Sequence, residues 1–248
     1  MKKIWRRIYS TYCLLAFILI FLLLLPFFLV LIQKKSWHKV ALQLNRVWSH
    51  VYFILCFIPV QLEWRFKPEK EQLYIFTPNH TSWFDVVIMG FIPKVFVFVG
   101  KVSITKVPVF GYMYRKLHIT VDRNSYRDRY KALLRAKQAI SEGKCLVMYP
   151  EGGIRTKNPP RMASFKDGAF RIAIEQQIPI VPVTIPYNWI VLPDDNSLLV
   201  YRRSIKAIFH EPIETKGMTI HHIDQLKEKT YHIIDQELRK IFPDKMKS

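Results

Sequence analysis

The strongest chemical signal in the sequence is a histidine followed five residues later by an aspartate. His80 and Asp85 bound this segment, which comes directly after the apolar run Leu73–Thr77. A histidine whose imidazole is held by a carboxylate can take a proton from a hydroxyl near neutral pH. The pair therefore indicates general-base catalysis on an alcohol, although His80 taken alone could equally be a buried structural histidine.

The spacing restricts how the two side chains can meet. Five residues correspond to ~140° around an α-helix, at ~100° per residue, so the side chains would diverge in the middle of a helix. We expect His80 in a turn between a strand and a helix, and Asp85 in the first turns of that helix. Ser82 or Thr81 then serves as the N-cap. Ser82 is also a candidate nucleophile, but it lacks a Gly-x-Ser-x-Gly elbow, which favours capping.

A second polar segment follows the apolar run Cys145–Tyr149. Its candidate binding residues are Glu151, Gly152, Gly153 and Arg155. Glycines let backbone amides approach a ligand closely, and arginine offers a planar fork for a phosphate group. The alternative is a polar turn without a ligand.

Two basic residues stand near the ends of other expected strands. Lys101 follows the apolar run Val95–Val99, and Arg123 follows Val121. Open α/β sheets bind ligands at the carboxyl ends of their strands, so both are candidate substrate-binding residues. Either could instead be a solvated surface charge.

Short apolar runs alternate with helical patterns from about residue 71 onward. The expected strands are Leu73–Thr77, Val95–Val99, Cys145–Tyr149, Ile180–Ile185, Leu198–Tyr201 and Ala207–Phe209, and the expected helices are Tyr126–Glu142, Phe165–Gln177 and His222–Ile241. Continuous apolar strands separated by helices predict an α/β fold, with a mostly parallel or mixed sheet flanked by helices. We assign residues 66–248 to this catalytic domain.

Residues 1–65 are predicted to form a membrane-anchoring helical segment. Cys13–Ile32 contains twenty residues without a charge, enough to cross a ~30 Å hydrocarbon core. A cleaved signal peptide is the alternative, but the small-residue cleavage pattern is missing after this run. A second apolar stretch, Val51–Val60, is too short to span and is predicted to be re-entrant or interfacial. The intervening Gln33–His50 is read as a basic connection.

The charge balance points to an anionic partner. The chain carries 38 Lys and Arg against 19 Asp and Glu, a formal net charge of +19, and eleven Lys or Arg against two Glu lie in residues 1–70. Beside an apolar anchor, this surplus favours anionic membrane lipid over nucleic acid, for which no recognised module is present. The three cysteines are far apart, and His221-His222 has no third ligand, so we expect no metal site.

Four blocks, in this order, resemble the 1-acylglycerol-3-phosphate acyltransferases and their relatives in the glycerophospholipid acyltransferase superfamily. His80–Asp85 matches the His-x4-Asp motif, and Lys101–Arg123 matches the second block. Glu151–Arg155 resembles the Glu-Gly-Thr-Arg block, with the arginine one position later than usual, and Ile180–Val183 matches the apolar-Pro block. The resemblance covers roughly residues 70–215.

The resemblance implies a glycerolipid acyltransferase fold and a set of roles. His80 is the catalytic base and Asp85 orients it, while the second and third blocks bind the phosphate of a lysophospholipid acceptor. The acyl donor is acyl-CoA or acyl carrier protein, no cofactor is required, and the product is phosphatidic acid. The shifted Arg155 leaves two alternatives open, acylation of a lyso-aminolipid or of glycerol 3-phosphate. We expect the enzyme at the cytoplasmic face of a bacterial inner membrane.

Overall fold

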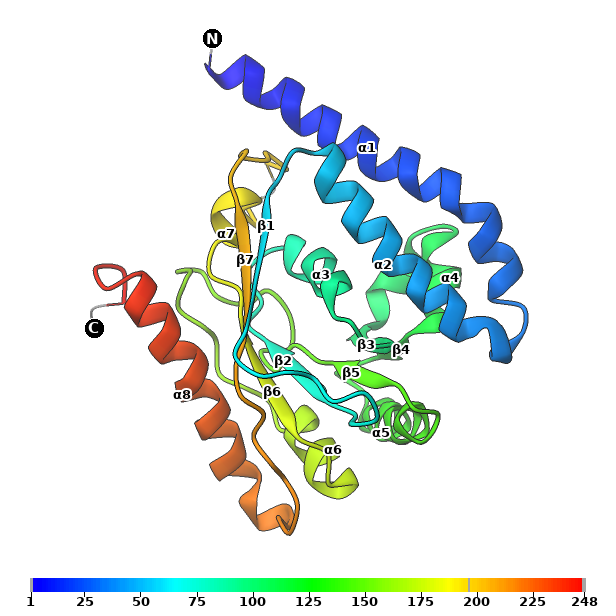
Figure 1. The fold of residues 1–248 in the computed structure, drawn as a ribbon, viewed down its shortest axis with the longest axis vertical. Coiled ribbons are helices and arrows are strands. Elements are labelled where there is room, and N and C mark those ends of the chain that lie inside the picture. Colours follow the sequence, from blue (N-terminus) through cyan, green and yellow to red (C-terminus); the bar gives the residue numbers. More distant parts are fainter. Residues whose placement is uncertain (1, 196, 247–248) are drawn as a thin grey trace.

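A seven-stranded sheet forms the centre of the computed structural model, which describes residues 2–195 and 197–246 (Figure 1). The strands are β1 Val60–Trp64, β2 Ile75–Pro78, β3 Phe96–Lys101, β4 Ile119–Val121, β5 Cys145–Val147, β6 Ile180–Thr184 and β7 Ile205–Phe209. Their order in the sheet is β1-β7-β6-β2-β5-β3-β4. Neighbouring strands are parallel except β6 and β7. The predicted mixed α/β sheet is confirmed.

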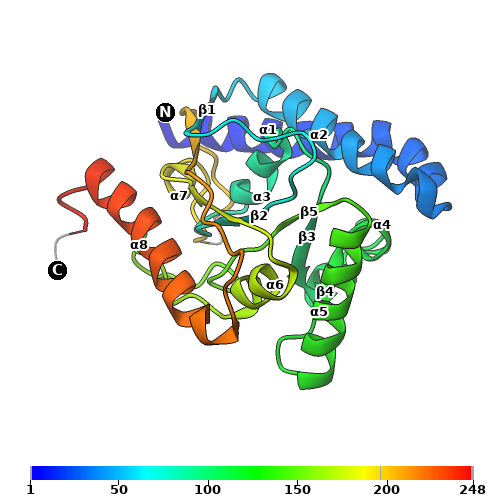
Figure 2. The ribbon, with the colours of Figure 1, turned by 60° about the horizontal axis from the view of Figure 1, so that its bottom comes forward.

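Helices lie on both faces of the sheet. They are α1 Lys2–Leu31, α2 His38–Leu55, α3 Phe84–Ile88, α4 Phe110–Leu117, α5 Tyr126–Ser141, α6 Gly168–Gln176, α7 Asn188–Val191 and α8 Ile223–Ile241, with short 3₁₀ turns at η1 Lys35–Trp37, η2 Met89–Phe91, η3 Val102–Lys106 and η4 Ile220–His222. Figure 2 shows α5, α6 and α8 on one face, with α2 on the other and α1 beside it. Covered on both faces, the central strands are buried throughout and mostly apolar, as the sequence predicted.

One predicted strand is wrong. Leu198–Tyr201 has no strand conformation, and Leu198 has a φ of 53°, which an extended strand cannot contain. The amide of Val200 donates to the Ser10 hydroxyl in α1 at 2.8 Å. The amide of Tyr201 donates to the Val191 carbonyl at 2.7 Å. This segment therefore packs on helices instead of adding to the sheet.

The N-terminal region forms a helical hairpin of α1 and α2. Its second helix begins at His38, so most of the expected basic connection Gln33–His50 is helix, which corrects that prediction. Ala41, Leu42 and Phe53 are buried on one face of α2, the pattern of an amphipathic helix against a core. The expected interfacial stretch after residue 50 is thus divided between the end of α2 and β1.

The hairpin is fastened to the sheet domain at its open end. In α1, Arg6 donates to the Tyr201 hydroxyl at 3.0 Å, which ties the hairpin to the sheet domain. The Tyr9 hydroxyl donates to the Cys56 carbonyl at the end of α2, at 2.7 Å, which joins the two helices of the hairpin. β1 belongs to the sheet through its parallel pairing with β7. The sheet therefore begins before residue 66, the position where we placed the start of the catalytic domain.

Candidate active site

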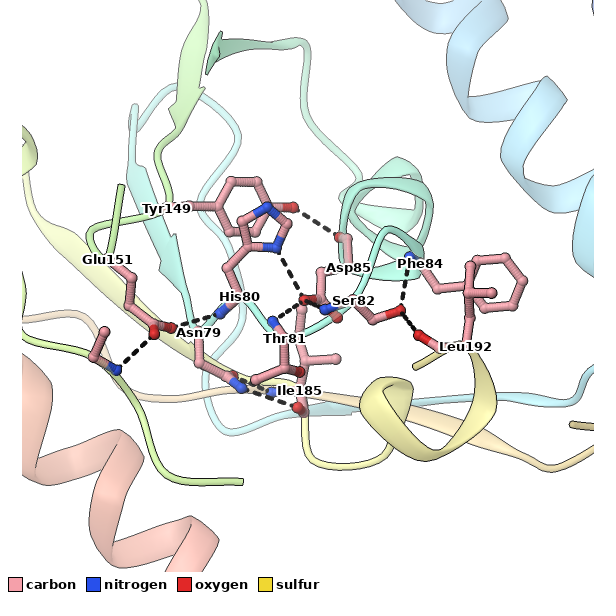
Figure 3. A network of polar contacts seen from close by, with 11 residues as sticks. Asn79, His80, Thr81, Ser82, Phe84, Asp85, Tyr149, Glu151, Ile185 and Leu192 are labelled. Atoms are coloured by element: carbon pink, nitrogen blue, oxygen red, sulfur yellow. Dashed lines mark hydrogen bonds and ion pairs between the residues drawn. The ribbon is translucent and has the colours of Figure 1, made fainter. Parts of the chain in front are cut away.

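The turn between β2 and α3 carries the histidine and the aspartate. β2 ends at Pro78 and α3 begins at Phe84, so His80 lies in the turn and Asp85 in the first turn of the helix. This arrangement was predicted from the spacing and is confirmed. His80 Nδ1 lies 3.0 Å from Asp85 Oδ2 (Figure 3). A carboxylate only accepts, so His80 carries its proton on Nδ1 and leaves Nε2 as the basic nitrogen.

Asp85 also shapes the turn that holds His80. The same oxygen, Oδ2, accepts hydrogen bonds from the amides of Thr81 at 2.6 Å and Ser82 at 2.8 Å. The Asp85 side chain is fully buried. One carboxylate therefore both orients the imidazole and holds the backbone turn around it. A substitution of Asp85 affects both interactions at once.

Tyr149 is a site residue that the sequence did not single out. Its ring stacks on the His80 imidazole with the ring centroids 4.0 Å apart. Its hydroxyl donates to the Asp85 backbone carbonyl at 2.8 Å (Figure 3). Tyr149 thus restricts the imidazole from one side. Its position at the end of the Cys145–Tyr149 run was the available signal.

Asn79 joins the catalytic turn to the neighbouring strand β6. Its side chain donates to the Ile185 carbonyl at 3.1 Å and accepts from the Ile185 amide at 2.7 Å. These paired bonds replace the strand pairing beyond the end of β2. They hold Asn79, and with it the adjacent His80, at the carboxyl ends of β2 and β6. This role depends on the tertiary structure.

Glu151 lies beneath the catalytic turn and does not line the cavity. Its carboxylate accepts from the His80 amide and from the Ala163 amide, both at 2.7 Å. The side chain is completely buried, and burial raises the pKa of Glu151 to about 7. We expected Glu151 to bind substrate, but its contacts are those of a residue that positions the His80 backbone.

The Ser82 hydroxyl is committed to local structure. It donates to the Leu192 carbonyl at 2.7 Å and accepts from the Phe84 amide at 3.2 Å. The residue immediately before α3 is Trp83, one later than the expected cap, yet the Ser82 oxygen still caps a first-turn amide. Because the Ser82 proton is given to a carbonyl and its side chain is fully buried, the geometry favours capping over nucleophilic attack.

Two arginines meet beside the glycine turn after β5. A Cβ atom on Gly152 would lie 3.6 Å from Arg123 Nη1 and 3.7 Å from Arg155 Nε. Gly152 and Gly153 have φ angles of +80° and +138°, which disfavour other residues. Burial, followed by the Arg155 charge, lowers the pKa of Arg123. Neither guanidinium pairs with a carboxylate in residues 2–195 and 197–246, so both keep donors available to an anion.

A cavity of about 1130 Å³ connects these groups. Of the predicted site residues, His80, Lys101, Arg123, Gly152, Gly153 and Arg155 line it, whereas Asp85 and Glu151 lie behind its wall. The cavity continues along the α1–α2 hairpin, where Phe17 and Trp48 line it. It thus joins the His80 imidazole, two arginine guanidiniums and a wall of mostly apolar side chains. Across the described ranges no cluster of His, Cys, Asp or Glu is arranged for a metal ion.

Comparison with known proteins gives the family. Residues 61–186 match the family model described as Acyltransferase. A chloroplastic 1-acyl-sn-glycerol-3-phosphate acyltransferase of Arabidopsis thaliana is 26% identical over 147 residues, which cover 59% of this chain and 41% of that protein. A 1-acyl-sn-glycerol-3-phosphate acyltransferase of Haemophilus influenzae is 27% identical over 192 residues, covering 73% of this chain and 76% of that protein. The chain thus spans about two fifths of the chloroplast relative.

One solved structure is similar over nearly the whole chain. It is the 1-acyl-sn-glycerophosphate acyltransferase PlsC of Thermotoga maritima, with a TM-score of 0.77 and 20% sequence identity. The alignment covers 97% of this chain and 98% of that protein. At this level of identity the comparison establishes the fold, including the helical hairpin before the sheet.

Proposed function

This chain belongs to the acyltransferase family, and we propose that it moves a fatty acyl group from a thioester to the hydroxyl of 1-acylglycerol 3-phosphate. The product is phosphatidic acid, an intermediate of phospholipid biosynthesis. The observation that carries the proposal is that one cavity is lined both by the His80 imidazole and by Arg123 and Arg155, whose guanidiniums have no carboxylate partner among the described residues. An acceptor with a hydroxyl and a phosphate group has one partner for each.

The reaction follows from the protonation of His80. Nε2 takes the proton of the acceptor hydroxyl as its oxygen attacks the thioester carbonyl. The imidazolium that forms is stabilised by Asp85, whose carboxylate is 3.0 Å from Nδ1. When the tetrahedral intermediate collapses, the C–S bond breaks and the thiolate takes the proton from Nε2. The thiol of coenzyme A or acyl carrier protein leaves, and His80 is neutral again.

The phosphate end of the cavity supports a phosphorylated acceptor. Arg123 is half-buried and Arg155 is exposed. Their positive charges repel each other, so an anion bound between them is favoured. Lys101 adds a further cation on the cavity wall. Glycerol 3-phosphate fits the same charges, but the apolar side chains of the α1–α2 hairpin that line the cavity favour an acceptor that already carries an acyl chain. A lyso-aminolipid has no phosphate group for the two arginines to bind.

Replacing Arg123 or Arg155 with alanine is expected to weaken phosphorylated acceptors selectively. One charge-assisted hydrogen bond is worth ~1.5–3 kcal/mol, so kcat/KM for 1-acylglycerol 3-phosphate should fall by roughly 10- to 150-fold. Turnover should be measured with this acceptor, with glycerol 3-phosphate, and with a lyso-aminolipid.

The matched control is Arg127→Ala, which removes an exposed arginine of α5. It should leave kcat/KM unchanged with every acceptor. Wild-type turnover of the lyso-aminolipid alone would contradict the proposed acceptor. Equal losses with phosphorylated and non-phosphorylated acceptors would contradict the role of the arginines.

We also propose that residues 2–58 anchor the enzyme at the membrane surface with α1 lying along it. Lys3–Leu31 is long and apolar enough to cross a bilayer. However, α1 packs beside α2 along the domain (Figure 1). Near the start of α1, the Ser10 hydroxyl accepts a hydrogen bond from the Val200 amide of the domain. A spanning α1 would have to break these contacts. Its exposed outer face includes Trp5, Leu19 and Phe27, which suit insertion into one leaflet. The basic surplus suits anionic lipid, as at a cytoplasmic face of a bacterial inner membrane.

An α1 that lies along the membrane keeps both of its ends on the same side. We therefore expect Lys3→Cys and Lys35→Cys to react with a membrane-impermeant maleimide from the same side of sealed membrane vesicles. Lys157→Cys reports the side of the catalytic domain, and the wild-type chain, whose cysteines are buried, gives the background. Labelling of residue 3 from the side opposite to residues 35 and 157 would show that α1 spans the bilayer.

A further inference from the structure

Two polar side chains on the cavity wall have no part in the reaction described so far. Tyr114 belongs to α4, and His118 follows the end of that helix. Their ring centroids are 4.7 Å apart, and both residues line the cavity. The wall around them is apolar, with Phe98 and Leu117 as neighbours.

The hydrogen bonding of His118 makes it a donor toward the cavity. Its Nδ1 accepts the Phe98 amide at 3.3 Å, so the ring proton is on Nε2. Burial lowers the pKa of His118 to about 3, and the ring is neutral at physiological pH. Nε2 has no partner among the described residues and is not sealed inside the protein. It therefore presents an uncharged N–H to whatever occupies the cavity.

The Tyr114 hydroxyl is held close by. A Cβ atom on Gly100 would come within 2.3 Å of the hydroxyl oxygen, so the hydroxyl lies directly on the backbone of β3. Burial raises the pKa of Tyr114, and the nearby Arg123 charge opposes this shift. No hydrogen-bond partner for this hydroxyl occurs in the part of the chain that the structure describes. It is a second uncharged group on the cavity wall, beside the His118 ring and within reach of the Arg123 charge.

A row of ring contacts connects His118 to the catalytic base. His80 stacks on Tyr149 with centroids 4.0 Å apart, Tyr149 faces Phe98 at 6.5 Å, and Phe98 contacts His118 at 5.3 Å. These rings form one wall of the cavity. An acceptor whose hydroxyl is at His80 and whose phosphate is at Arg123 lies along this wall.

We propose that Tyr114 and His118 bind the carbonyl oxygen of the ester that the lysolipid acceptor already carries. The inference rests on the proposed function, which places the acceptor hydroxyl and phosphate and leaves its ester as the remaining polar group. A neutral donor on an apolar wall suits an uncharged carbonyl, whereas the phosphate is bound by the charged arginines. The pair makes the enzyme selective for acyl over alkyl lysolipids.

The test compares 1-acylglycerol 3-phosphate with its 1-alkyl ether analogue of the same chain length, which lacks the carbonyl. A neutral hydrogen bond is worth ~0.5–1.5 kcal/mol, so wild-type kcat/KM should be roughly two- to twelvefold higher for the ester. His118→Phe keeps an aromatic ring without the donor, and Tyr114→Phe removes only the hydroxyl. In each variant the ester should lose activity while the ether does not, and the preference should shrink toward one.

His221→Phe makes the same substitution at an exposed histidine of η4 and should keep the full preference. Thermal unfolding shows whether each variant folds, and Tyr114→Phe remains informative if His118→Phe does not. Equal wild-type rates on ester and ether would overturn the inference. So would equal losses on both acceptors, because the pair would then act on the thioester that both reactions share. If wild type acylates neither acceptor, the proposed function itself fails.

Discussion

Replacing His80 with alanine is expected to abolish acyl transfer without unfolding the protein. The His80 imidazole lines the same cavity as Arg123 and Arg155, and a general base contributes ~10²–10⁴-fold to the rate. The turn should persist, because the Asp85 carboxylate still accepts the Thr81 and Ser82 amides. We therefore expect kcat to fall by at least this factor, measured with labelled acyl-CoA and 1-acylglycerol 3-phosphate, while membrane binding is unchanged.

The control is His221→Ala, which removes an exposed histidine far along the chain from the cavity-lining segments. It should have wild-type kcat. A His80→Ala protein that is folded and keeps most of its activity would exclude general-base catalysis by this residue.

Replacing Asp85 with asparagine is expected to have the second largest effect, of roughly 10²–10⁴-fold on kcat. The amide cannot stabilise an imidazolium, and it can turn an N–H toward His80 and favour the wrong tautomer. The three hydrogen bonds on Oδ2, from the His80 ring and the Thr81 and Ser82 amides, also lose their charged acceptor. Each is worth ~1.5–3 kcal/mol when charged, so the melting temperature should fall as well.

Ser82→Ala separates these two consequences. It removes the bonds of the hydroxyl to Leu192 and Phe84 and should therefore destabilise the same turn, but it leaves the histidine and its carboxylate intact. We expect a lower melting temperature with most of the activity retained. Similar losses of kcat in Asp85→Asn and Ser82→Ala, at matched stability, would reduce Asp85 to a structural role. Isolation of an acyl ester on Ser82 would favour a covalent mechanism.

Local sequence patterns determined the central part of this fold. The apolar runs at β2, β3, β5, β6 and β7 are continuous because those strands are covered on both faces. β1 was not predicted, and β4 was indicated only by its end at Val121. The β1 segment Val60–Trp64 lies at the sheet edge and has no fully buried residue, and β4 is only three residues long. Leu198–Tyr201 has strand composition, but tertiary contacts with α1 and α7 decided its conformation.

The catalytic pair could be inferred from the sequence alone. With a spacing of five residues, the two side chains meet when the histidine lies in the turn after a strand and the aspartate lies in the first turn of the following helix. The roles of distant residues could not. Glu151 resembled a binding residue, yet the parallel pairing of β2 and β5 places its carboxylate under His80. Tyr149, Asn79 and His118 act through contacts between segments distant in sequence. Composition and spacing specify which groups a chain carries and how its local segments fold, but strand order decides which of those groups meet.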